Sequence, residues 1–145
     1  MKRTLTSLTS LLLLLALFLS FGACVTPETP EIPADPWSEA VYTTDTELGE
    51  GDVTFTFEVV CGENKVTFTI HTDEEILGDA LVRLDLLEGE EGAYGLYVKR
   101  VNGVLSDYDV DASYWSLLVN GEYAMVGVDS TPVEAGAVYC FMRVK

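Results

Sequence analysis

Basic residues are scarce in this sequence. Eight lysines and arginines stand against 24 aspartates and glutamates, which gives a formal net charge of −16 at pH 7. Proteins that bind nucleic acid need clustered basic side chains to neutralise phosphates, and no basic stripe is present. Nucleic acid is therefore excluded as a partner. The charge indicates a solvated acidic surface, with recruitment of a cationic partner as the alternative.

Histidine is nearly absent as well, since His71 is the only one. It falls at the end of a predicted strand, where nothing in the sequence places a second nitrogen or thiolate ligand beside it. No Ser-His-Asp or Cys-His combination can be completed around it, and no glycine-rich phosphate loop occurs. The sequence therefore predicts a protein that is not an enzyme and that holds neither a metal nor a resident cofactor.

One acidic segment partly matches a calcium-binding loop. Asp107, Asp109 and Asp111 occupy the first three ligand places of such a loop. Ala112 stands where the sharp turn requires glycine, and Leu118 stands where a bidentate glutamate would close the ligand shell. An acidic surface turn is the favoured interpretation, and a weak cation site is the alternative.

The N-terminal apolar run is shorter than the roughly 20 residues that a transmembrane helix needs. It extends from about Leu11 to Leu19, is preceded by Lys2 and Arg3, and is followed by small residues. This is the arrangement of an export signal peptide, which we assign to residues 1–23 and exclude from the fold.

The end of the leader resembles the lipobox of bacterial lipoproteins. Residues 21–24 read Phe-Gly-Ala-Cys, and in that family the cysteine, here Cys24, becomes the lipidated first residue of the mature chain. The resemblance implies a lipid anchor at the outer face of the bacterial cell membrane, because several acyl chains together give stable anchoring. Ordinary cleavage near Ala23, giving a secreted product with a free thiol, is the alternative.

Residues 24–52 are rich in proline, threonine and glutamate, and they begin with VTPETPEIPADP after the cysteine. Each proline removes a backbone donor and disfavours helix in the residue before it, while the carboxylates repel one another. We therefore expect a disordered tether that separates the membrane from the domain. Trp37, Val41 and Tyr42 leave a second interpretation open, in which the end of this segment packs onto the domain.

Residues 53–145 remain as one domain, and its first half alternates between apolar and polar residues. The segment VTFTFEVV, starting at Val53, has the period of a half-buried strand. A turn at Gly62–Asn64 is followed by a second alternating segment through Val66, Phe68 and Ile70. The two segments predict a β-hairpin.

A single helix is predicted next. Its apolar positions recur at helical spacing, after acidic residues suited to a helix N-terminus and before Gly89 as a C-terminal cap. These apolar positions are Leu77, Ala80, Leu81, Leu84 and Leu87.

Asn-Gly pairs mark two further hairpins, at Asn102-Gly103 and Asn120-Gly121, because both central residues of a type I′ turn need positive φ. With a closing strand from Ala137 to Val144, the order predicts an α+β domain, one helix packed on a mixed or antiparallel sheet.

Cys61 and Cys140 each fall at or in a predicted strand. Export to an oxidising compartment would permit a disulfide between them, provided that the first and last strands are neighbours and the two β-carbons approach to about 4 Å. Two buried thiols are the alternative.

Aromatic residues are concentrated in the second half of the chain. Tyr114 and Trp115 are adjacent in a predicted strand, so their side chains must point to opposite faces of the sheet. We expect Trp115 to pack in the core. An exposed Tyr114, with Tyr97 or Tyr123, is the better candidate for a contact surface.

Several motifs together resemble a family of bacterial exported domains similar to the C-terminal domain of transcobalamin and intrinsic factor. The motifs are GDALVRLDLL, YGLYVKRVNG, the Tyr114-Trp115 pair followed by two leucines, and Gly127-Val128-Asp129. The resemblance covers about Leu77 to Lys145. It implies a small β-grasp-like, non-enzymatic domain, which in the vitamin carriers closes over one face of cobalamin.

The resemblance implies a corrinoid as the bound ligand. The carriers also have a large helical domain, for which this chain has no room, so one module would hold a corrinoid weakly or with a partner. A protein-interaction or spacer module of the cell envelope is the alternative function. The positions carried over are Tyr94, Gly95, Tyr97, Asn102, Gly103, Tyr114, Trp115, Leu117 and Leu118, and the predicted ligand contacts among them are Tyr94, Tyr97, Tyr114, Trp115 and Leu117.

Overall fold

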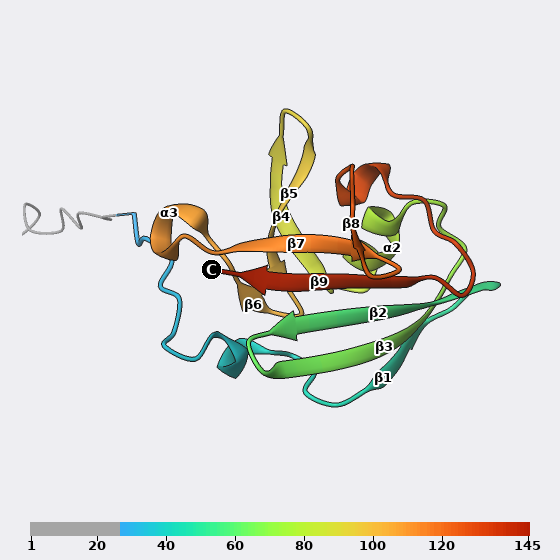
Figure 1. Ribbon diagram of the computed structural model, residues 1–145, viewed down its shortest axis with the longest axis horizontal. Coiled ribbons are helices and arrows are strands. Elements are labelled where there is room, and N and C mark those ends of the chain that lie inside the picture. Colours follow the sequence, from blue (N-terminus) through green and yellow to red (C-terminus); the bar gives the residue numbers. More distant parts are fainter. Residues whose placement is uncertain (1–26) are drawn as a thin grey trace, which may run out of the picture.

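The computed structural model describes residues 27–145 (Figure 1). The predicted signal peptide and Cys24 lie outside the described residues. None of the helices in this range is long and apolar enough to cross a bilayer. The elements are η1 (Pro36–Glu39), β1 (Thr46–Gly49), β2 (Val53–Cys61), β3 (Asn64–Thr72), α2 (Leu77–Arg83), β4 (Leu87–Gly92), β5 (Gly95–Val101), β6 (Val104–Leu105), α3 (Tyr108–Asp111), β7 (Tyr114–Val119), β8 (Glu122–Tyr123), η2 (Val128–Ser130) and β9 (Val138–Val144).

Two sheets make up the domain. Six strands form a mixed sheet in the order β1-β3-β2-β9-β7-β8, and three form an antiparallel sheet in the order β4-β5-β6. The pairs β1/β3 and β2/β9 are parallel, and the other pairs in the large sheet are antiparallel. Figure 1 shows the β4–β5 hairpin projecting beyond β7, on the side of the large sheet away from β1. The structure confirms the predicted α+β class with one main helix.

Phe57 lies at the centre of the core. Its ring is fully buried, stacks against Phe68 with centroids 5.8 Å apart, and meets Phe141 edge to face at 6.2 Å. The three rings come from β2 and its two neighbours, β3 and β9. They meet because side chains of paired strands that share a face of the sheet contact one another. Helix α2 adds Leu77, Ala80 and Leu81 to the same core. The alternation predicted for the first hairpin is confirmed.

Both Asn-Gly pairs form the predicted turns. Asn102 and Gly103 join β5 to β6 with φ of 52° and 82°, and Asn120 and Gly121 join β7 to β8 with φ of 51° and 84°. Positive φ at both central residues matches the twist of antiparallel strands.

Helix α2 is shorter than predicted. It ends at Arg83, and Asp85 adopts a φ of 57° that interrupts the helical path. Leu87 then begins strand β4, and Gly89 lies within that strand, so the assignment of Gly89 as the helix cap is wrong. The apolar spacing continues past the end of the helix because Leu87, although it belongs to a strand, is buried in the same core.

The predicted disorder of residues 24–52 is wrong for the second half of this segment. β1 adds a parallel edge strand to β3, and Trp37, Tyr42 and Leu48 pack against the core. The Tyr42 ring meets Phe68 edge to face, with centroids 5.4 Å apart. Burial of these apolar side chains offsets the entropy lost on ordering the segment. The folded domain therefore begins near η1 rather than at residue 53.

Asn102 attaches this N-terminal segment to the β5–β6 turn. Its fully buried amide donates from Nδ2 to the carbonyl of Tyr42 at 2.8 Å and accepts at Oδ1 from the Tyr42 N–H at 2.9 Å. Asn102→Gly keeps a residue suited to positive φ but removes both bonds. We expect a loss of about 2 kcal/mol in the free energy of unfolding, measured in urea, and faster proteolysis within residues 35–45.

Asn120→Gly is the matched control. Asn120 occupies the equivalent turn position but is exposed, and its Oδ1 accepts one bond, from the Val138 N–H at 2.9 Å. The control should lose about half as much stability or less, without faster proteolysis near residue 40. Equal losses in the two variants would contradict the role assigned to Asn102.

Cys61 and Cys140 are free, buried thiols. They lie on neighbouring parallel strands, but Cys140 is opposite Glu58 and Cys61 is opposite Arg143. Because side chains alternate along a strand, this register puts the two sulfur atoms on opposite faces of the sheet. The possible disulfide is therefore not formed. Burial raises the pKa of the Cys140 thiol to about 11.

Two of the three carboxylates of the acidic turn are paired with cations of the domain, and Asp109 is exposed. Asp107 caps α3 and accepts from Lys99 Nζ at 2.9 Å, whereas Asp111 accepts from Arg143 at 2.8 Å and lies 3.3 Å from Lys145 Nζ. The carboxylates thus face separate cations. Across residues 27–145, no three His, Cys, Asp or Glu side chains are grouped so that they could hold a metal.

Asp111 should make stability depend on acid pH. Its partial burial raises its pKa, but hydrogen bonds from Ser113, Arg143 and Lys145 outweigh burial and lower the pKa from 3.8 to about 2. Because the folded-state pKa is below the unfolded value, ionised Asp111 stabilises the fold above pH 3.8. This contribution, about 2 kcal/mol, is lost as the pH falls from 3.8 through about 2.

The measurement is urea unfolding at pH 5, 3 and 2 for the parent protein and for two variants. Asp111→Asn should flatten the acid limb of the stability profile, and the exposed Asp109→Asn should leave it unchanged. If the free energy of unfolding fell equally at acid pH in Asp111→Asn and in the parent, this assignment would be wrong.

Candidate functional site

The five predicted contact residues do not form one surface. Tyr94 and Tyr97 lie on the β4–β5 hairpin and are 98% and 45% exposed, and Tyr114 is 42% exposed at the start of β7. Trp115 and Leu117 instead belong to the core side of β7. Trp115 is 8% exposed, which confirms the prediction that it packs inward while Tyr114 faces solvent. Trp115 is a buried core residue, and Leu117 is partly buried against the same core, so neither is presented on the surface with the three tyrosines.

The β4–β5 hairpin is shaped by two glycines. A Cβ at Gly89 would lie 2.2 Å from the carbonyl oxygen of Tyr97, at the bulge where the register shifts between Glu88 and Gly89. Gly95 follows the tip with a φ of 97°. A bulge increases local twist, and only glycine adopts such a φ readily, so both positions set the direction in which the hairpin projects.

Asp129 fastens the hairpin tip to η2. Its Oδ2 accepts from the backbone N–H of Leu96 at 2.7 Å. On the other side, a Cβ at Gly78 of α2 would lie 2.6 Å from Asp129 Oδ1, so the absence of a side chain at Gly78 lets helix and carboxylate approach closely. One carboxylate thus lies between the hairpin and the helix, which fixes the loop before η2 relative to both.

That loop presents apolar side chains to solvent. Tyr123, Met125 and Val126 are 69%, 96% and 53% exposed. Figure 1 shows β8 and the following loop beyond β7, on the same side as the hairpin. We call the exposed side chains of the hairpin and the loop the apolar rim, which consists of Tyr94, Tyr97, Tyr123, Met125 and Val126.

The sequence predictions missed Met125 and Val126. They follow a two-residue strand and carry no periodic pattern, so their type indicates burial while their loop position puts them at the surface. The available indication was three apolar residues, Ala124 to Val126, placed between a turn and Gly127. Apolar residues grouped on the surface of a protein are typical of a contact site.

A cleft of about 580 Å³ lies behind the loop. Its floor includes Val119, Thr131 and the buried Tyr139, and its sides are the segment after β8 and the segment before β9. The cleft is lined by Val119, Asn120, Glu122, Tyr123, Ala124, Met125, Val126, Thr131, Pro132, Glu134 and Tyr139.

A second cavity, of about 460 Å³, is lined in part by His71. The His71 ring is fixed on the sheet face, with Nε2 2.6 Å from Glu47 Oε1 and Nδ1 2.9 Å from Thr54 Oγ1. Thr54, whose hydroxyl contacts the His71 ring, is not among the residues that line the cavity. These contacts therefore link β1, β3 and β2 across the sheet.

Comparisons with known proteins agree with this fold. Residues 75–138 match a family model described as a domain of unknown function, DUF4430. The crystal structure of a protein from Ruminococcus gnavus ATCC 29149, described provisionally as metal binding, has a TM-score of 0.61 and 27% identity, over 65% of this chain and 98% of that chain. No curated protein matches the sequence significantly.

Haptocorrin, in a crystal structure of its complex with Cbi, has a TM-score of 0.52 and 21% identity. The match covers 64% of this chain but 25% of haptocorrin, so the chain corresponds to a quarter of that protein. At this identity the likeness shows the fold, and it confirms the predicted transcobalamin-like, β-grasp-type domain. The segment 75–138 begins before α2 and reaches the start of β9, and so includes the hairpin, the apolar rim and most of the cleft. Residues 75–138 of this chain are therefore similar to the DUF4430 family model, and the fold resembles part of haptocorrin.

Proposed function

We propose that the protein is a non-enzymatic ligand-binding module whose ligand is a corrinoid, and that the apolar rim makes the contact. The observation that carries the proposal is the exposure of Tyr94 and Met125, at 98% and 96%, on elements that Asp129 holds in place. A folded protein gains nothing in stability from side chains so exposed. Rigid elements that present aromatic and apolar groups are suited to binding a large, flat, partly apolar molecule.

The fold supports this choice of ligand. Haptocorrin is seen with Cbi, and this chain resembles a quarter of haptocorrin. We propose that the module covers one face of the corrinoid, so that binding is weak when it acts alone and tighter when a partner covers the other face. On binding, the ligand loses translational and rotational freedom. Contacts on one side alone offset only part of this cost, which limits the affinity.

Cobinamide titration of the purified protein, followed by calorimetry, tests the proposal. We expect saturable binding that the double variant Tyr94→Ser/Met125→Ser weakens about tenfold or more, since buried aromatic and thioether anchors dominate such contacts. Tyr114→Ser, which removes an exposed tyrosine from β7, is the matched control and should bind as the parent does. A flat trace with the parent protein up to millimolar cobinamide would exclude the corrinoid and leave an envelope interaction or spacer module as the function.

We also propose that Cys24 carries the lipid that holds the module at the outer face of the bacterial membrane. With the leader removed, six basic residues remain against 24 acidic ones, and this charge repels an anionic bilayer. Expression of the full chain in bacteria supplied with radiolabelled palmitate should label the parent protein and not Cys24→Ser. The membrane fraction should retain the parent and release the variant, and label in Cys24→Ser at the parental level would refute the anchor.

A further inference from the structure

Every lysine and arginine in residues 27–145 is already paired with a carboxylate. The contacts range from 2.5 to 3.9 Å. The pairs are Lys65 with Glu58, Arg83 with Glu74, Lys99 with Asp107 and Glu90, Arg100 with Glu39, and Arg143 and Lys145 with Asp111. Within this part of the chain, no basic side chain is left over to neutralise another carboxylate or to receive an anionic ligand.

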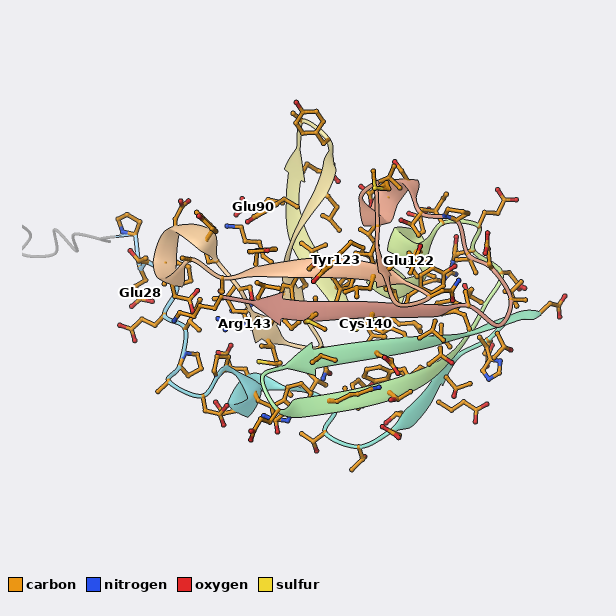
Figure 2. The ribbon with its side chains drawn as sticks, viewed as in Figure 1. Glu28, Glu90, Glu122, Tyr123, Cys140 and Arg143 are labelled. Carbon is orange, nitrogen blue, oxygen red and sulfur yellow. The ribbon has the colours of Figure 1, made fainter. Side chains whose placement is uncertain are left out.

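Two of the remaining carboxylates line the cleft behind the apolar rim. Glu122 and Glu134 are exposed at its sides, and neither forms an ion pair with a described residue. Glu122 lies opposite Val119 and Val119 lies opposite Tyr139, so the three share one face of the sheet. Figure 2 labels Glu122 and Tyr123 on either side of β8, as alternation along a strand requires.

The floor of the cleft is held by hydrogen bonds. The Tyr139 hydroxyl donates to the carbonyl of Pro132 at 2.8 Å and accepts from the N–H of Glu134 at 2.9 Å. The hydroxyl of Thr131 donates to the carbonyl of Gly127 at 2.9 Å. These bonds tie both ends of the lining to one another, so the cleft exists before any ligand binds. Its polar floor groups are satisfied, which leaves the carboxylates as the free charged groups.

From these observations we infer that the cleft behind β8 binds a small apolar organic cation, such as an aromatic or alkyl quaternary ammonium. The volume, about 580 Å³, is within the range of small-molecule sites. Val119, Met125 and Pro132 offer apolar contact, and the two glutamates supply the opposite charge. The net charge of the chain attracts cations from solution and repels anions. The cleft adjoins the apolar rim and shares Tyr123, Met125 and Val126 with it, but the inference rests on the two glutamates and does not depend on the corrinoid proposal.

The probes are benzyltrimethylammonium, its neutral analogue benzyl alcohol and its anionic analogue benzenesulfonate, each titrated into the purified protein. Binding is followed by the ¹³C methyl signal of Met125 and the amide signals of residues 119–126. We expect saturable shifts with the cation, weaker shifts with the alcohol and none with the sulfonate. Raising the salt concentration should weaken binding of the cation, because exposed charges are screened within about 10 Å at 0.1 M.

Glu122→Gln/Glu134→Gln should weaken cation binding about five- to tenfold and leave binding of the alcohol unchanged, since exposed carboxylates attract a cation only modestly and do not attract the neutral alcohol. The matched control is Glu58→Gln/Glu63→Gln, which removes the same charge from β2 and the following turn, away from the cleft. Equal binding of cation and alcohol by the parent, or equal weakening by the two double variants, would overturn the inference. Cobinamide titration of the same variants is a separate readout, because its loss or retention bears on the corrinoid proposal alone.

Discussion

Arg143→Met is expected to destabilise the protein by about 3 kcal/mol, measured as the free energy of unfolding in urea. The Arg143 side chain is 8% exposed, and its guanidinium donates to Asp111 at 2.8 Å, to the Ser113 hydroxyl at 2.9 Å and to the carbonyl of Leu105 at 3.3 Å. Methionine fills most of the same space but leaves Asp111 as a partly buried charge. Lys145, 3.3 Å away and 64% exposed, can compensate for only part of the loss.

The double variant Arg143→Met/Asp111→Asn separates the cost of an unpaired charge from the loss of packing. Removing the charge of Asp111 together with that of Arg143 should recover about half of the lost stability, because no buried ion then lacks a partner. Lys65→Met removes an exposed lysine from its pair with Glu58 and should cost about 0.5 kcal/mol. The assignment is wrong if Lys65→Met and Arg143→Met cost the same.

Phe57→Ala is expected to cost about 4 kcal/mol, the other large effect. The ring is fully buried and touches Phe68 and Phe141, so its removal opens a cavity between the three central strands of the large sheet. The surrounding rings belong to paired strands and cannot move in to fill the space. Urea unfolding gives the free energy, and the slope of the transition shows whether the folded state has stayed compact.

Two variants calibrate this result. Phe57→Leu retains most of the volume and should cost about 1.5 kcal/mol, whereas Tyr94→Ala removes an aromatic ring that is 98% exposed and should change stability by less than about 0.5 kcal/mol. A loss below about 1 kcal/mol in Phe57→Ala would show that β2, β3 and β9 do not enclose the core described here.

The sequence patterns predicted the parts of the fold that depend on interactions between residues near one another in the chain. The Asn-Gly turns at residues 102 and 120 require positive φ from two adjacent residues, and the strand alternation from Val53 requires only one buried face. The end of α2 was mispredicted because Leu87 keeps the helical spacing while it enters strand β4. The pairing of β1 with β3 was missed because an edge strand of four residues gains its stability from tertiary contacts, which its own sequence does not display.

The candidate site was predicted only in part, for a similar reason. Tyr94 and Tyr97 were found because they belong to a motif with a recognisable resemblance, and the structure puts both on the exposed hairpin. Met125 and Val126 come near that hairpin through Asp129, which accepts a hydrogen bond from a residue 33 positions away in sequence. Periodicity cannot indicate such a contact. Trp115 was predicted both to pack in the core and, through the resemblance, to contact a ligand, and the structure confirms the core position.

The central claim is that the apolar rim is the surface that contacts the ligand. Amide spectra of the ¹⁵N-labelled protein, recorded during titration with cobinamide, test it most directly. Saturable shifts are expected in residues 94–97 and 123–127, at the hairpin tip and the loop before η2. Shifts concentrated around Tyr114, at the end of β7 that does not pair with β8, or no shifts at all, would contradict it.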